Sequence, residues 1–345
     1  MPGSSSRVIT HPEKVLFPDD GITKGDLCDY YQAVAPFMVP HIAGRPITME
    51  RFPAGIDKKG FIQKDVSKGF PDWLQRVAVE KRQGEPGELV HYPLVTDERS
   101  LLWLANQNSI TPHVWTARVP KLHHPDVFVV DLDPSADDPK ALRAAVLAVR
   151  DLLNELGLPS LVKTSGSKGF HVVVALDGKA DYDSVWRFGH GAGALLVKRH
   201  PELFTQEFIK ADRAGRILVD TGRNLAGATF AAVYAVRPKP GAPVSAPCTW
   251  DEIESGRVGP RTFTLRTMAK RLADAGDLWR GVERQAQSLR EPLTALESLL
   301  SDADWKEAHA ATTRRPASRQ APRRKVSGSV QKSPRGGTRA RAARD

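Results

Sequence analysis

Residues 127–133 read VFVVDLD, four apolar residues that lead into two acids, Asp131 and Asp133. A short apolar run of this kind, bounded by polar residues, is typical of a buried β-strand. Successive strand residues point to opposite faces, so residues two apart share a face. The two carboxylates are therefore predicted to project together from one end of a strand.

A second apolar run, ILVD at 217–220, also ends in an acid, Asp220. A neighbouring strand could therefore add a third carboxylate to the first two. Carboxylates held together repel one another and need cations to neutralise them. The pattern predicts a site for two Mg²⁺ or Mn²⁺ ions on Asp131, Asp133 and Asp220, where the ions activate an attacking oxygen and stabilise a leaving phosphate. The alternative is that these acids only end strands in solvated loops, because an isolated DxD pair is common.

Residues 164–171 read TSGSKGFH, between two apolar runs, and predict a strand, a glycine-rich turn and a second strand. Gly166 and Gly169 let backbone amides approach phosphate oxygens closely. Polar and charged side chains complete a cradle for a triphosphate: Ser165, Ser167, Lys168 and His171. An ordinary hairpin is the alternative, since Ser, Gly and Lys are normal turn residues. The GxxxxGK[ST] spacing of a P-loop is absent. Arg223, three residues after Asp220, is a candidate to neutralise charge that develops during phosphoryl transfer.

Helical and strand patterns alternate around these motifs. Apolar residues recur at helical spacing over 140–156, and a helix from 24 to 35 is expected to end at Pro36. Further helices are predicted over 184–199 and 264–300, further strands at 217–220 and 229–237, and a Pro-rich connector at 238–247. We therefore predict an α+β fold with an antiparallel component at its centre, an N-terminal α/β module and C-terminal helices. The expected divisions are 1–120, 121–240 and 241–300 within one domain of 1–300, followed by a tail at 301–345.

The charge of the chain is concentrated at its C-terminus. The net charge of the 345 residues is +10, and residues 311–345 hold eleven Lys or Arg against one acid, whereas the first 310 residues hold 39 of each sign. This Arg-, Ser-, Pro- and Gly-rich tail has little to bury and is predicted to be disordered. It is expected to contact nucleic acid weakly, or else to act only as a solubilising extension. A second basic patch, between residues 45 and 82, has nine basic residues against five acids.

The composition excludes several classes of protein. No apolar run approaches the roughly 18 to 20 residues of a membrane span, and the N-terminus lacks the apolar core of a signal peptide. Cys28 and Cys248 are isolated from each other, which excludes a disulfide framework and a Cys-rich zinc site. We expect a cytoplasmic, nucleoid-associated protein.

Three motifs, DLDP (131–134), TSGSKGFH (164–171) and VDTGRN (219–224), resemble in order and spacing those of the archaeo-eukaryotic primase superfamily, specifically the polymerase domain of bacterial ligase D. The likeness runs from about residue 8 to 300, and TSGSKGxH is its most specific part. Members of this branch are template-dependent polymerases of nonhomologous end joining. They prefer ribonucleotides, often work with Mn²⁺, and recognise the 5′-phosphate of a gap or broken end. The resemblance implies a primase-type core with an antiparallel, RRM-like sheet and NTP or dNTP substrates.

Carried over by position, the resemblance assigns the metal ions to Asp131, Asp133 and Asp220. Around the incoming triphosphate it places His113, Ser165, Lys168, His171, Arg223 and Arg237. For His113, a packed histidine beside Trp115 is the alternative. The resemblance implies that the 5′-phosphate is held by Lys14 and Lys24. It makes Phe61 a platform for the template base, with Arg51 and Lys64 close by in the basic patch.

The sequence departs from the family pattern in two ways. Related chains have two adjacent aromatics where this one has Phe61 followed by Ile62, so stacking on the template is expected to be weaker. No ligase or phosphoesterase domain follows, so the chain looks like a free-standing form whose sealing step another protein supplies. The expected partners are gapped or broken DNA with a 5′-phosphate, together with Ku and a separate DNA ligase as candidates. We expect a monomer.

Two other functions were weighed. A haloacid-dehalogenase-type phosphatase also carries DxD after an apolar strand, but it has no use for the 164–171 turn. A non-catalytic DNA-end-binding protein would use the basic tail and patch, but three converging acids would repel DNA phosphates unless cations neutralised them.

Overall fold

The computed structural model describes residues 9–66, 68–81 and 85–313. Its centre is a six-stranded sheet whose strands, in order across it, are β11 (Phe204–Thr205), β12 (Ile217–Asp220), β8 (Val127–Pro134), β10 (Phe170–Ala175), β9 (Leu161–Thr164) and β14 (Pro247–Cys248). The apolar run of β8 lies in the middle and pairs antiparallel with both neighbours, β12 and β10. Phe128, Val129 and Val130 are buried, as the continuous apolar run predicts.

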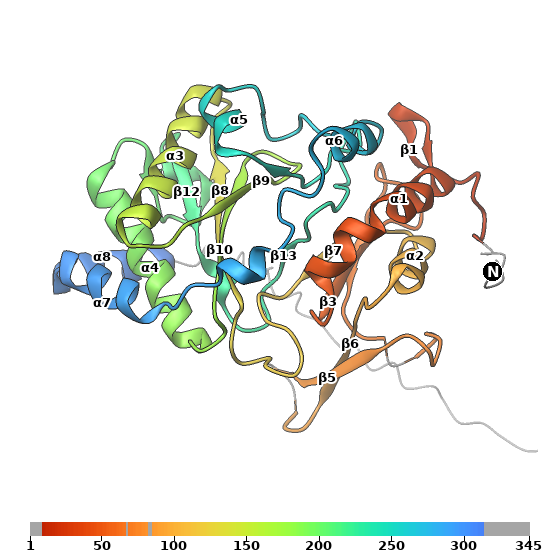
Figure 1. Cartoon of the computed structure of the whole chain (residues 1–345), viewed down its shortest axis with the longest axis horizontal. Coiled ribbons are helices and arrows are strands. Elements are labelled where there is room, and N and C mark those ends of the chain that lie inside the picture. The colour runs from red at the N-terminus through yellow and green to blue at the C-terminus, as the bar shows by residue number, and fades with distance from the viewer. Residues whose placement is uncertain (1–8, 67, 82–84, 314–345) are drawn as a thin grey trace, which may run out of the picture. The chain divides into compact units, whose positions relative to one another are not determined.

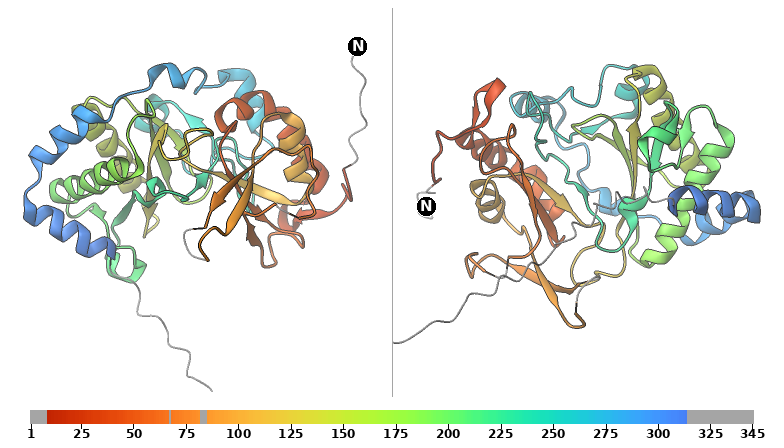
Figure 2. Two further views of the ribbon diagram at one scale, coloured as in Figure 1. Left: turned by 90° about the horizontal axis from the view of Figure 1, so that it is seen from below. Right: turned by 180° about the vertical axis from the view of Figure 1, so that it is seen from behind.

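Helices α3 (Pro139–Glu155) and α4 (Tyr182–Arg199) pack against this sheet (Figure 1). α3 begins where the sequence predicts, because the Asp138 carboxylate accepts hydrogen bonds from the amides of Lys140 and Ala141, and Pro139 occupies the first turn. The short α5 (Trp250–Glu254) lies against α3. Figure 2 shows α7 (Arg290–Leu299) and α8 (Asp302–Thr313), in blue, lying against α4.

The glycines of α4 explain how it approaches its neighbours. A Cβ added to Gly189 would lie 2.9 Å from the Phe128 ring, and one on Gly191 would lie 2.5 Å from the Trp305 ring. The helix therefore forms despite its glycines because they face close neighbours, and tertiary packing outweighs their low helix propensity.

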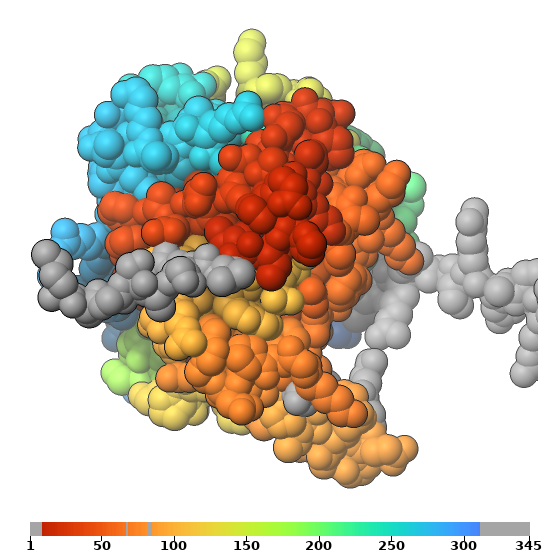
Figure 3. Space-filling view, turned by 90° about the vertical axis from the view of Figure 1, so that its right-hand side faces the viewer, coloured from red at the N-terminus to blue at the C-terminus, as the bar shows by residue number. Residues whose placement is uncertain are grey.

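The first third of the chain forms a second sheet with its own helices. The strands of this sheet, in order, are β13 (Phe230–Ala231), β7 (Ser109–Val114), β3 (Ile47–Arg51) and β4 (Phe61–Gln63). Helices α1 (Lys24–Ile42) and α2 (Glu98–Asn106) pack on each other, and two hairpins add β1 (Val15–Phe17), β2 (Ile22–Thr23), β5 (Arg76–Glu80) and β6 (Leu89–Pro93). Figure 3 looks onto this part of the molecule, in red and orange. Because β13 comes from the later part of the chain, residues 230–231 join this sheet to the rest of the fold.

The predicted α+β fold with an antiparallel central sheet is confirmed, and one continuous apolar core runs through both sheets. Several boundaries were wrong. α1 continues through Pro36 and Pro40 to Ile42, because both prolines lie on its exposed side, where carbonyls left without an amide partner can be hydrated. Buried Val34 and Met38 hold the opposite side of the helix in the core.

The later segments are more broken than predicted. Only Phe230 and Ala231 of the expected strand at 229–237 pair as a strand, and the connector at 238–247 ends in β14. The helical patterns expected over 264–300 form α6 (Met268–Ala275), a 3-10 turn (Val282–Gln285) and α7. Gly276 ends α6, and Gln287 bonds to Ala175 and Asp177 between the turn and α7.

The tail was expected to begin at 301, yet Asp302–Thr313 forms α8 on α4; the basic residues from 314 onward lie outside the described residues. Within the described ranges, no helix combines the length and the apolar character needed to cross a membrane.

Candidate active site

The sheet register brings the three predicted acids to one place. Asp131 on β8 lies directly opposite Asp220 on β12 and His171 on β10. Asp133 follows two residues later on the same strand. All three acids line a cavity of about 320 Å³, here called the carboxylate cavity. The seven residues predicted to surround a nucleotide line it too: His113, Ser165, Ser167, Lys168, His171, Arg223 and Arg237.

Arginines balance the charge of these acids. Arg223 lies 3.1 Å from the Asp131 carboxylate and 3.4 Å from that of Asp220. Arg213, which is buried, donates to Asp133 at 2.9 Å. As the side chains stand, no three His, Cys, Asp or Glu side chains in the described ranges are arranged to share one metal ion. The carboxylates are therefore gathered but are held by guanidinium groups.

Asp131 has a perturbed titration. Its burial raises its pKa to about 6; Arg223 opposes the rise, and the neighbouring carboxylates of Asp220 and Asp133 add to it. Perturbed titration of this kind in a cavity is a mark of functional sites.

The predicted turn is built around one hydroxyl. Ser165 Oγ accepts hydrogen bonds from the amides of Ser167 and Gly169, both at 3.1 Å, and so closes the turn. The turn packs tightly on β8, because a Cβ on Gly169 would lie only 1.7 Å from the carbonyl oxygen of Leu132. Gly166 has φ +64°, in the left-handed region that favours glycine. Ser165 therefore shapes the cradle as well as lining it.

Three basic side chains that line the carboxylate cavity differ in their surroundings. Lys168 is exposed at the tip of the turn, and no ion-pair partner is found for it in the described ranges. Arg237 lies behind the turn, its guanidinium 3.5 Å from the Ser165 carbonyl oxygen. His113 on β7 lies 3.1 Å from the Glu50 carboxylate, and its burial lowers its pKa. His113 thus makes a polar contact inside the cavity.

Burial lowers the pKa of His171 well below its usual value, and the nearby cation of Lys163 lowers it further. The neutral ring faces Asp131, with Nε2 3.4 Å from the carboxylate.

Several residues around the cavity were missed by sequence reasoning. Arg213 and Phe208 lie in a stretch without any motif. Glu50 holds His113 from the neighbouring strand β3 of the same sheet. Lys163 is completely buried under the cavity, where its ammonium donates to the Ala231 carbonyl at 3.0 Å and to Ser245. Its place inside an apolar run gave no sign of this role.

Asn224, which like Arg223 was expected to reach the phosphates, is completely buried instead. Its side chain bonds both the amide and the carbonyl of Val129, at 2.8 and 2.7 Å. It therefore fixes the segment after β12 onto β8, and with it Arg223. Its position in the VDTGRN motif was the available signal.

None of the five predicted DNA-contact residues lines the carboxylate cavity. The β1–β2 pairing brings Lys14 and Lys24 together, since the Lys24 amide donates to the Lys14 carbonyl. Lys24 is 3% exposed and donates to Thr10, whereas Lys14 is half-buried. On the four-stranded sheet, the guanidinium carbon of Arg51 lies 5.3 Å from the centre of the Phe61 ring, and Phe61 is 46% exposed.

Lys64, the fifth of these residues, is also exposed, one residue beyond β4. Ile62, at the position where related chains have a second aromatic, is 55% exposed.

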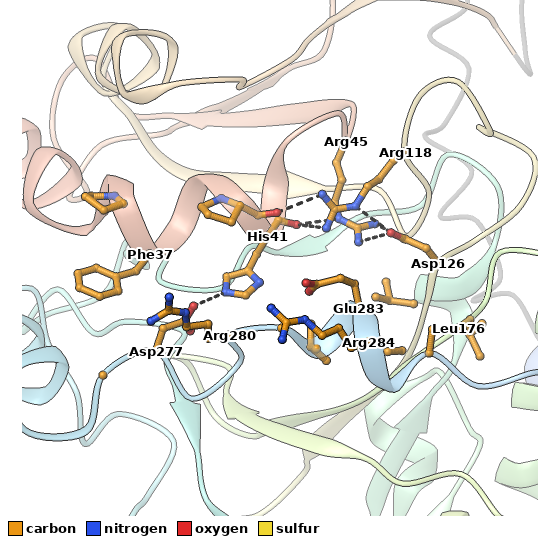
Figure 4. A pocket seen from close by; sticks show the side chains of 18 residues that line it. Phe37, His41, Arg45, Arg118, Asp126, Leu176, Asp277, Arg280, Glu283 and Arg284 are labelled. Atoms are coloured by element: carbon orange, nitrogen blue, oxygen red, sulfur yellow. Dashed lines mark hydrogen bonds and ion pairs between the residues drawn. The ribbon is translucent and has the colours of Figure 1, made fainter.

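A second cavity, of about 610 Å³, lies at the opposite end of β8 and β10 (Figure 4). Arg45 and Arg118 both bond to Asp126 there and donate to carbonyls at the end of α1. His41 pairs with Asp277 at 2.8 Å. These groups fasten α1 to the start of β8 and stabilise the C-terminus of α1. None of the sequence-predicted site residues lies in this cavity.

The fold is that of a polymerase domain. The polymerase domain of ligase D from Mycobacterium tuberculosis, solved in complex with DNA, matches with a TM-score of 0.76 and 33% identity, over 82% of this chain and 100% of that one. The sequence model of the LigD primase-polymerase domain matches residues 23–279. The chain therefore belongs to the LigD primase-polymerase domain family.

Two multifunctional relatives show the extent of the similarity. The non-homologous end joining protein LigD of Mycolicibacterium smegmatis is 32% identical over 294 residues, which is 84% of this chain and 38% of the relative. The LigD protein of Pseudomonas aeruginosa is 34% identical over 275 residues, 78% of this chain and 32% of the relative. The chain thus spans well under half the length of these proteins.

Proposed function

We propose that this chain is a template-dependent nucleotidyltransferase that adds nucleotides at DNA gaps and broken ends, in the repair of breaks by end joining. The observation that carries the proposal is the carboxylate cavity, where three acids, a glycine-rich turn and three arginines converge in a member of the primase-polymerase family. In this proposal residues 121–240 form the catalytic core and residues 1–120 the module that contacts DNA.

The donor set of the cavity fits two divalent ions. Carboxylate oxygens suit both Mg²⁺ and Mn²⁺, and bound cations would neutralise the three carboxylates that the cavity gathers. Asp131, Asp133 and Asp220 would hold the ions. When bound, such ions make an attacking hydroxyl more acidic and stabilise the charge on the leaving pyrophosphate.

The remaining residues bind and orient the nucleotide. Lys168 and the amides of the 165–169 turn would hold the phosphates, with Ser165 keeping the turn closed and Ser167 adding a hydroxyl. Arg223 and Arg237 would neutralise charge that develops during transfer.

Two histidines complete the pocket. His113, steadied by Glu50, and the neutral His171, facing Asp131, would line the nucleotide pocket.

DNA would lie on the N-terminal module. Lys14 and Lys24 would hold the 5′-phosphate, and Phe61 would stack on a template base, with Arg51 and Lys64 beside it. Ku and a separate ligase are the proposed protein partners. The proposal includes a preference for ribonucleotides and activity with Mn²⁺.

The phosphatase alternative has little support from the topology. The glycine-rich turn joins the antiparallel strands β9 and β10, and such a phosphatase has no use for this strand–turn–strand unit beside its acids.

Extension of a 5′-phosphorylated gapped duplex tests the function. Each NTP and dNTP is supplied with Mg²⁺ or Mn²⁺, and the Asp133→Ala variant is run beside the wild type. We expect extension by the wild type alone, with ribonucleotides preferred, and similar DNA binding and circular dichroism for both proteins. Extension by Asp133→Ala would refute the assignment, and phosphate release without a template would favour a phosphatase.

A further inference from the structure

Phe208 is the most exposed large apolar side chain of the described residues, at 62%. A single exposed apolar residue needs no explanation by itself. Phe208, however, lines the carboxylate cavity, whose other walls are mostly polar or charged. An open aromatic ring at a nucleotide-sized site offers a face on which a base can stack.

The backbone that carries Phe208 is fixed to the acids. The buried Arg213 donates to the carbonyls of Glu207 and Phe208, at 3.0 and 2.9 Å, and to the carboxylate of Asp133. One guanidinium therefore ties this segment to a predicted metal ligand. The ring is held at the edge of the cavity by its backbone and is not carried on a free loop.

The strand order shows on which side of the acids this ring lies. The 165–169 turn joins β9 and β10, on one side of β8. Phe208 follows β11, beyond β12, on the other side of β8. The ring and the phosphate cradle are thus on opposite sides of Asp131 and Asp133.

Phosphoryl transfer sets the direction of approach. The attacking and leaving oxygens lie roughly in line, on opposite sides of the phosphorus. With the pyrophosphate on the turn, as the proposed function requires, the 3′-hydroxyl of the growing strand arrives from the β11–β12 side. The last nucleotide of that strand then reaches Phe208.

We propose that Phe208 stacks on the terminal base of the strand being extended and so positions its 3′-hydroxyl at the acids. Lys210, exposed two residues later, would meet a phosphate of the same strand. The contact is distinct from the template platform, because Phe61 is on β4 of the other sheet. The inference rests on the proposed function.

The first experiment measures this contact without catalysis. A gapped duplex carries 2-aminopurine, which stacking quenches, as the last base at the 3′ end; Mg²⁺ is present and nucleotide is omitted. The wild type and Phe208→Trp should quench the probe, and Phe208→Ala should not. Leu299→Ala, which removes an exposed apolar residue from α7, is the control and should behave as wild type. Equal quenching by Phe208→Ala and the wild type would overturn the proposal.

The second experiment is a double-mutant cycle in which one change is made in the protein and the other in the DNA. Removing the terminal base, to leave an abasic sugar, should lower kcat/KM of the wild type about tenfold or more. Removing the terminal base should lower kcat/KM of Phe208→Ala much less, because that variant has no ring for the base to contact. If Phe208→Ala instead raised KM for the nucleotide equally with both strands, the ring would serve the incoming base and the proposal would be wrong.

The two experiments distinguish a failure of the stacking contact from a failure of the proposed polymerase function. Quenching that depends on Phe208, without extension by any of these proteins, would keep the stacking contact and remove the polymerase function. If all variants extended the strand and the effect of removing the terminal base did not depend on Phe208, the polymerase function would stand and the stacking contact would be wrong.

Discussion

Asp131, whose side chain is 16% exposed, provides the most quantitative prediction. Its removal from water raises its pKa to about 6, from the ordinary value of 3.8. The folded protein therefore binds this proton more tightly than the unfolded chain does. It follows that ionising Asp131 destabilises the fold, and that the free energy of unfolding contributed by this group falls as pH rises from about 4 through about 6.

The size of the effect follows from the shift. Each pKa unit corresponds to about 1.4 kcal/mol, so about two units give a penalty of about 3 kcal/mol at pH 8 and about half of that at pH 5. Asn cannot ionise and should avoid this penalty. Arg223 would not be left unpaired in Asp131→Asn, because it also contacts Asp220. We therefore expect Asp131→Asn to be more stable than the wild type by up to about 3 kcal/mol at pH 8, while losing nucleotide addition.

Urea denaturation between pH 5 and 8, in a chelator, measures this difference. Asp29→Asn, at an exposed position on α1, is the matched control for the loss of a carboxylate. Mn²⁺ should stabilise the wild type and not Asp131→Asn, because the ions bind the ionised acids. A variant less stable than the wild type at pH 8, or a stability difference that does not change with pH, would refute the reasoning.

Two further changes test other parts of the molecule. Gly169→Ala should lower the free energy of unfolding by about 1 to 3 kcal/mol, because the added methyl overpacks against Leu132. It should also slow extension by about a hundredfold if the turn shifts by about 1 Å. Gly259→Ala is the control, since a Cβ at that position would have its nearest neighbour at 3.7 Å. Wild-type melting and extension by Gly169→Ala would contradict this account of the turn. Deleting residues 314–345 should weaken DNA binding and make it less dependent on salt, with extension retained; complete loss of extension would instead favour a protein that only binds DNA.

The sequence predicted the local chemistry well where one physical cause dominated. The run VFVV can only be buried, so β8 and the common face of Asp131 and Asp133 followed from the alternation of strand residues. The prediction failed where tertiary contacts outweighed local signals. Pro36 ends a helix in isolation, but here the buried side of α1 holds the helix through it.

The same reason explains the residues that were missed. Lys163 looks like an interruption in a strand, and only the folded chain places its ammonium against Ala231 and Ser245. Arg213 lies 80 residues from Asp133 in the sequence, so no local pattern could link them. Contacts of this kind depend on strand order, which short-range patterns do not specify.

By itself, then, the sequence determined which residues carry charge, which turn can cradle phosphate, and where the apolar runs end. Those properties follow from side-chain chemistry and from the periodicity of a strand, both of which are local. Only the tertiary structure decided that Asp220 faces Asp131, that arginines hold the acids, and that Phe208 stands across the acids from the turn. The register and order of strands set these distances, because they bring together residues that are far apart along the chain.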